Sequence, residues 1–168
     1  KAQQDELCRI LDRLKEVNIN TVLLQTRVRG SVIYPSAIEP WDGCLTGTPG
    51  RAPGYDPLAF AVRECHKRGM ELHAWLVAIP CFKISAATRM GNRSVLKTHP
   101  KLCVRHGDSW YLAPGQPETA DYLASLCREI AANYDVDGIH FDYIRYPENA
   151  AKFNDASSYR KYGKRQNK

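Results

Sequence analysis

The chain has 168 residues, of which 43% are hydrophobic and 25% are charged, and its formal net charge is +6. This composition is typical of one globular domain and excludes a collagen, a coiled coil and a wholly disordered chain. The longest apolar run, residues 74–80, is far too short to span a bilayer. Residues 1–3 lead directly into a polar helix, so we expect no signal peptide within this sequence. The excess of basic residues permits an anionic partner but does not require one.

The first half of the chain predicts a helix, a strand and a second helix. Apolar residues recur at helical spacing over residues 7–17, and the β-branched segment 21–27 follows as a strand. Asp56 and Pro57 signal the start of the second helix, because Asp caps free amide groups and Pro fits the first helical position. Gly69 is expected to end this helix.

The second half of the chain repeats this alternation. Residues 70–79 predict a strand, a third helix begins near Pro117, and residues 138–143 predict the last strand. From Ala150 the sequence is polar, and its last nine residues include five Lys or Arg. We expect residues 150–168 to form a basic, solvated end.

The links between these elements differ in length. Those from helix to strand are short, whereas two links from strand to helix are long, covering residues 28–55 and 80–116. Parallel βα folds bind ligands at the carboxyl ends of their strands, and long loops are uncommon unless they are functional. The long links therefore indicate which end of the sheet is the working end.

Three strands cannot close a barrel, since a TIM barrel needs eight strands and about 250 residues. We predict an α/β fold that is a partial TIM (β/α)8 barrel, with about strands 2–4 and their helices in residues 1–149. A complete small α/β sandwich is the alternative, but it would bury a three-stranded parallel sheet poorly.

Six cysteines are scattered without any CxxC pair, which argues against a zinc ribbon or a thioredoxin motif. Cys8, Cys65 and Cys127 fall on apolar helix faces, where Cys acts as a small hydrophobic residue. We expect buried free thiols.

Alternation along the strands predicts one polar face, because successive strand side chains point to opposite sides. The residues expected to share the barrel mouth are Gln25, Arg27, His73, Trp75, His140 and Asp142. Asp142 is the candidate catalytic residue, because a carboxylate at the carboxyl end of a barrel strand is typical of catalysis. The alternative is a structural hydrogen-bond network inside the barrel.

Residues near the mouth could bind a substrate. Tyr143 and Arg145 flank Asp142, and Arg145 could hold it ionised or bind a substrate carboxylate. Arg29 could contact an anionic group, and loop aromatics such as Trp41 could stack on sugar rings. The alternative for these aromatics is that they pack the long loops against the domain.

Other chemical motifs are absent from the sequence. It contains no GxGxxG, GxxxxGK[ST], HExxH or GxSxG, so no nucleotide, cofactor or nucleophile-elbow site is predicted. His140 and Asp142 have a spacing seen in some metal hydrolases, but two ligands do not make a metal site. No motif for reading nucleic acid is present.

Several local motifs together resemble the glycosyl-hydrolase-like 10 family over nearly the whole chain. The segments that carry the resemblance are 27–30 (RVRG), 34–35 (YP), 39–41 (EPW), 45–47 (LTG), 53–58 (PGYDPL), 66–69 (HKRG), 73–75 (HAW), 135–147 (DVDGIHFDYIRYP), 153–155 (FND) and 158–160 (SYR). The resemblance implies a (β/α)8 barrel from the bacterial cell envelope, periplasmic or secreted and often a lipoprotein. It also implies glycoside hydrolysis, with peptidoglycan glycan strands as a substrate for some members, and a chain that lacks the first strand and everything after the fourth.

Glycoside hydrolysis typically requires two carboxyl groups. Asp142 can be one, whereas the other candidates in the first 110 residues lie on loops: Glu39, Asp42, Asp56 and Asp108. We therefore expect the second carboxylate in the missing strands and no activity from this piece alone. Two alternatives stay open: a metal-dependent barrel hydrolase using His140 and Asp142, and a non-catalytic glycan-binding protein.

Overall fold

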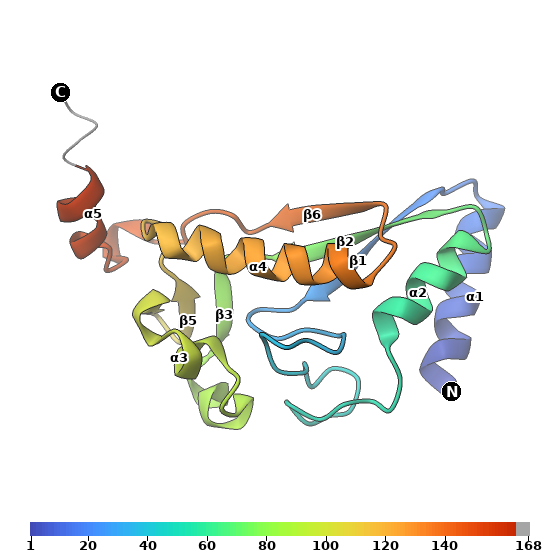
Figure 1. Ribbon diagram of the computed structural model, residues 1–168, viewed down its shortest axis with the longest axis horizontal. Helices are drawn as coiled ribbons and strands as arrows, with labels where there is room; N and C mark the ends of the chain where they lie inside the picture. The colour runs from blue at the N-terminus through green and yellow to red at the C-terminus, as the bar shows by residue number, and fades with distance from the viewer. Residues whose placement is uncertain (164–168) are drawn as a thin grey trace.

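The computed structural model, which describes residues 1–163, contains a parallel sheet whose helices cover one face (Figure 1). The elements of this layer are α1 (Ala2–Glu16), β1 (Thr21–Arg27), α2 (Pro57–His66), β2 (Glu71–Val77), α4 (Pro117–Asn133) and β6 (Gly138–Asp142). The strand order is β1-β2-β6, and both pairings are parallel. The predicted α/β fold, a partial (β/α) barrel, is confirmed. In the described part of the chain, no helix has the length and apolar character needed to cross a membrane.

The core lies between the sheet and its helices. On β2, Leu72, Ala74 and Leu76 are fully buried, and His73 and Trp75 on the other face are partly exposed. The start of α2 is built as the sequence predicts, since the Asp56 side chain accepts a hydrogen bond of 3.0 Å from the amide of Ala59. The hydrophobic face of the sheet is thus fixed toward the helices, which leaves the polar face free.

A second, antiparallel sheet fills the link between β2 and α4, and the sequence did not predict it. Its strands are β3 (Pro80–Lys83), β4 (Cys103–His106) and β5 (Ser109–Leu112), in the order β3-β5-β4. Between β3 and β4 lie the short helices η1 (Ile84–Met90), α3 (Val95–Thr98) and η2 (Pro100–Leu102). This small sheet extends from the carboxyl end of the parallel sheet in Figure 1.

The segment after β6 is mostly exposed over residues 150–163, but it is folded and anchored at one point. It forms η3 (Ala150–Lys152) and α5 (Ala156–Tyr162). Phe153 between them is only 6% exposed. Its ring lies 5.4 Å from that of Tyr146, 5.7 Å from that of His106 and 6.2 Å from that of Tyr111. A single aromatic residue in a polar sequence therefore anchors this segment to the second sheet. Residues 164–168 lie outside the described part.

The six cysteines are free thiols, as predicted, but their burial varies. Cys65 and Cys81 are buried, Cys8, Cys103 and Cys127 are half-buried, and Cys44 is exposed. Burial raises the pKa of Cys65 to about 11 and that of Cys81 to about 12. These two thiols therefore stay protonated at neutral pH and act as small hydrophobic residues.

The prediction that Arg27 faces the barrel mouth is wrong, because the strand register changes just before it. Gln25 lies opposite Trp75, but Arg27 lies opposite Leu76, so β1 contains one extra residue at this point. Such a bulge turns the following side chain to the other face of the sheet. Arg27 consequently points toward the helix side, where it is fully buried.

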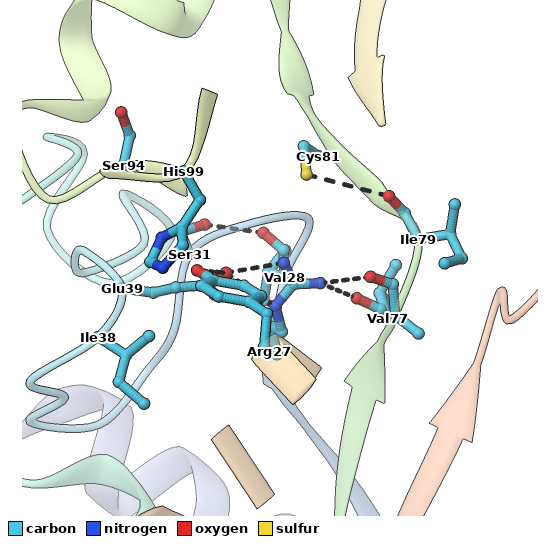
Figure 2. A network of polar contacts seen from close by, with 12 residues as sticks. Arg27, Val28, Ser31, Ile38, Glu39, Val77, Ile79, Cys81, Ser94 and His99 are labelled. Carbon is cyan, nitrogen blue, oxygen red and sulfur yellow. Dashed lines mark hydrogen bonds and ion pairs between the residues drawn. The ribbon is translucent and has the colours of Figure 1, made fainter. Parts of the chain in front are cut away.

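A buried ion pair between Arg27 and Glu39 occupies that side (Figure 2). Arg27 Nη2 lies 2.7 Å from Glu39 Oε1, Nε lies 2.9 Å from Oε2, and neither side chain is exposed. Arg27 Nη1 also donates to the carbonyls of Val77 and Ala78, and the Tyr122 hydroxyl donates to Glu39 at 2.8 Å. Burial disfavours the charged guanidinium, but Glu39 outweighs this effect and raises the pKa of Arg27. The pair joins the 28–55 link to the end of β2 and to α4.

The carboxylate of Glu129 also anchors the 28–55 link. Glu129 of α4 accepts hydrogen bonds from the hydroxyls of Tyr34 and Ser36, at 2.9 and 2.6 Å, and from the amide of Ala37 at 2.6 Å. Burial and Glu129 together raise the pKa of Tyr34, which keeps this hydroxyl a donor. The link is thus held at two places along α4.

At the amino end of the sheet, Asp137 joins three elements. Its Oδ2 accepts from the amide of Leu72 at 2.7 Å and lies 2.9 Å from His66 Nε2. The hydrogen bond from His66, followed by that from Leu72, lowers the pKa of Asp137. Asp137 therefore ties α2 and β2 to the start of β6.

Replacing Glu39 with Gln should lower the unfolding free energy of the full-length protein by about 3–5 kcal/mol, because it leaves the Arg27 charge buried without its partner. Urea unfolding followed by circular dichroism measures this change. Asp108→Asn is the control: it removes an ion pair with Lys83 of which both side chains are more than half exposed, and should leave stability unchanged. A Glu39→Gln protein as stable as the wild type would contradict the central role of the pair.

Replacing Asp137 with Asn should make stability less dependent on acid pH. Because the folded pKa of Asp137 is lowered, its carboxylate stabilises the fold above the unfolded pKa of about 3.9 and loses this effect as the pH falls through the folded pKa. We expect Asp137→Asn to lower the unfolding free energy by about 1 kcal/mol at pH 7, with the difference vanishing toward pH 2. Asp135→Asn, whose side chain is 97% exposed, should show no such trend in the same titration.

Candidate active site

The polar face of the parallel sheet carries most of the predicted site. Gln25 lies opposite Trp75 in the β1–β2 register, and Trp75 lies opposite His140 in the β2–β6 register. His73 and Asp142 share this face by alternation along their strands. The structure thus brings together five of the six residues predicted for the mouth, and the exception is Arg27.

Asp142 is the last residue of β6, at the carboxyl end of the sheet. Its carbonyl accepts from the amide of Ala78 at 2.8 Å, and its Oδ1 accepts from the amide of Tyr143 at 2.6 Å. Within residues 1–163, Oδ2 has no hydrogen-bond partner. The strand and one amide therefore orient a half-buried carboxylate and leave one of its oxygens available.

The aromatic residues on this face are closely packed. The His73 ring covers Gly138 so tightly that a Cβ atom there would lie 2.7 Å from Nδ1, which explains why glycine starts β6. The Trp75 and His140 rings meet edge to face with centroids 6.4 Å apart. Trp75 Nε1 is buried and has no partner in the described part of the chain, so its hydrogen-bonding capacity is unused.

A pocket of about 270 Å³ lies at the strand ends beside this face. Its lining residues are Arg29, Pro80, Tyr111, Tyr143, Arg145, Tyr146, Pro147 and Glu148. Arg29, Tyr143 and Arg145 were predicted to bind substrate, and the structure brings these three together. Glu148 was not predicted, although it directly follows the segment 135–147 that carries the family resemblance.

Trp41 is not brought to this pocket. It lies half-buried in the 28–55 link, bridged through its backbone to Val32, and its carbonyl accepts from the amide of Gly50 at 2.8 Å. Its role in binding sugar stays a prediction. A larger cavity of about 1070 Å³ lies along α4, and none of the predicted site residues lines it.

The four loop carboxylates predicted as candidates for a second catalytic group all have structural partners. Glu39 is buried with Arg27, and Asp56 caps α2. Asp42 accepts from the Ser31 hydroxyl at 2.6 Å and from the amide of Cys44 at 2.7 Å, while Asp108 lies 3.1 Å from Lys83 Nζ. In residues 1–163, no group of three or more His, Cys, Asp or Glu is arranged to hold a metal ion.

Comparisons with known proteins agree with this architecture. The chain is 39% identical over 176 residues to glycosyl hydrolase DigH of Escherichia coli (strain K12), a match that covers 97% of this chain and 39% of DigH. It is 35% identical over 170 residues to glycosyl hydrolase YngK of Bacillus subtilis (strain 168), covering 98% of this chain and 33% of YngK. The chain therefore spans less than half the length of these relatives.

A solved structure with a similar fold is the noncanonic maltogenic α-amylase AmyB from Thermotoga neapolitana. The TM-score is 0.57 at 17% identity, and the match covers 97% of this chain and 39% of AmyB, so the likeness concerns the fold alone. The sequence model of the glycosyl hydrolase-like 10 family matches residues 1–168. Because this match covers the whole chain, the chain belongs to the glycosyl hydrolase-like 10 family.

Proposed function

We propose that the full-length protein hydrolyses glycosidic bonds in a cell-wall or other polysaccharide, with Asp142 as one of its two catalytic carboxylates. The observation that carries this proposal is the position of Asp142, at the carboxyl end of β6 on the polar face of the sheet. Catalytic residues of (β/α)8 barrels come from this end of the strands. The glycosyl hydrolase-like family and the glycosidase fold support the same reaction class.

Asp142 would act as the nucleophile or as the acid/base. Retaining enzymes place the two carboxyl groups about 5 Å apart, whereas inverting enzymes place them about 6.5–9.5 Å apart. Each of the four loop carboxylates predicted as candidates already has a structural partner, so we expect the second group from the part of the relatives that this chain does not span. We therefore expect the isolated 168-residue chain to lack activity.

The other residues of the polar face would position the sugar. Gln25, His73 and His140 carry donors and acceptors suited to sugar hydroxyls. Trp75 adds an aromatic surface next to His140. Peptidoglycan glycan strands are our first candidate for the polysaccharide, and this substrate would place the protein in the cell envelope.

Replacing Asp142 with Asn in the full-length protein should lower kcat by about 10²- to 10⁴-fold, because the amide cannot act as nucleophile or acid/base. Binding of the glycan should persist, since Asn keeps the size of the side chain. Release of reducing ends from purified glycan strands measures turnover, and co-sedimentation with insoluble peptidoglycan measures binding.

Asp135→Asn is the matched control for this experiment. This carboxylate precedes the same strand at its other end and is 97% exposed, so its loss should leave turnover unchanged. Unchanged turnover in Asp142→Asn would remove Asp142 from the mechanism. Binding without product release by the wild-type protein would instead favour a glycan-binding protein, and robust cleavage by the 168-residue chain would refute the need for a second carboxylate from elsewhere.

A further inference from the structure

We propose that the pocket at the strand ends is a subsite for a carboxylate of the sugar chain, and that Arg29 and Arg145 hold this carboxylate and so determine specificity for an acidic glycan. This inference rests on the proposed function, because it assigns a sugar chain to the pocket. It adds a specificity element that Asp142 and the polar face do not supply.

The charge of the lining favours a single negative charge. The lining includes two arginines, Arg29 and Arg145, and one acidic residue, Glu148. Within residues 1–163, neither arginine forms an ion pair with an acidic side chain, in contrast to Arg27 and Arg68. The net charge of the lining is therefore about +1, which matches a sugar carboxylate better than a doubly charged phosphate ester.

The backbone is strained at two lining residues. In the described residues, four non-glycine residues have positive φ, and two of these are asparagines, which tolerate this conformation. The other two are Arg29, with φ of 54°, and Tyr143, with φ of 50°. Both line this pocket, at the ends of β1 and β6. Such strain clusters at functional sites, where the surrounding structure holds a side chain in a required direction.

The walls of the pocket orient Arg145. The guanidinium of Arg145 lies over the Tyr143 ring, 5.1 Å from its centroid, which restricts its orientation. Tyr146 donates to Asp155 Oδ2 at 2.9 Å and packs against Phe153, and His106 Nε2 donates to the carbonyl of Glu148 at 3.0 Å. A fixed guanidinium can bind a carboxylate through two parallel hydrogen bonds, and the tyrosine rings offer flat surfaces to the sugar.

The test measures how tightly the full-length protein binds two forms of one polymer. Purified peptidoglycan glycan strands are used as isolated, and after their carboxyl groups have been reduced to alcohols, which removes the charge and keeps the backbone. We expect the wild type to bind the native strands at least about tenfold more tightly than the reduced strands, a difference of about 1.4 kcal/mol. Arg145→Gln and Arg29→Gly should both abolish this preference.

We expect Arg29→Gly to fold as the wild type does, because glycine adopts the positive φ of this position without strain. Its melting temperature should not fall, so that lost discrimination is caused by the missing guanidinium. Arg51→Gln is the control for general charge effects, since Arg51 is exposed and lines neither cavity, and it should keep the preference of the wild type.

The outcomes separate the two proposals. Equal binding of both polymers by the wild type, binding of neither, or an unchanged preference in Arg145→Gln would overturn the carboxylate subsite. Cleavage is recorded on the same samples as a separate readout. If both polymers are cleaved equally well, the subsite is wrong while the hydrolase proposal stands. If the native polymer is bound selectively but neither polymer is cleaved, the hydrolase proposal fails and the anion selectivity stands.

Discussion

The buried ion pair between Arg27 and Glu39 is the constraint on which the working end of the sheet depends. Neither side chain is exposed, so each charge requires the other to offset its desolvation. Arg27 also donates to the carbonyls that end β2, which fixes the two strand ends relative to one another. Arg29 follows two residues later in the strained conformation that places it in the pocket. A structural pair on the helix side thus lies two residues before a candidate binding residue at the strand ends.

The elements of the parallel layer could be predicted because their signals are local. The Asp56 cap, the proline at the start of α2 and the alternation along β2 each depend on neighbouring residues. The direction of Arg27 could not be predicted, since a bulge in β1 reverses the alternation and leaves no signature in composition. The second sheet was missed because β3, β4 and β5 have only four residues each, too few for a periodic signal. The packing of Phe153 depends on rings more than forty residues away, as with His106.

The residues of the candidate site also divide into those with local sequence signals and those placed by long-range contacts. Alternation correctly placed Gln25, His73, Trp75, His140 and Asp142 on one face, because these residues lie in regular strand. It could not show that Glu39 is buried, since its partners are Arg27 across an irregular link and Tyr122, which lies 83 residues away in the sequence. Nor could it show that Arg29, Tyr143 and Arg145 converge, because the irregular segments after β1 and β6 have no fixed period.

The two ends of β6 show how one residue type takes opposite roles. Asp137, just before the strand, has two donors on one oxygen and a lowered pKa, so it remains charged and joins three elements. Asp142, at the other end, receives a single hydrogen bond from the amide of the next residue. The two donors on Asp137 come from α2 and β2, so this carboxylate joins elements of the fold, whereas Asp142 is bonded only to its own neighbour. The four residues 138–141 therefore separate a structural carboxylate from one that has an oxygen available for a substrate.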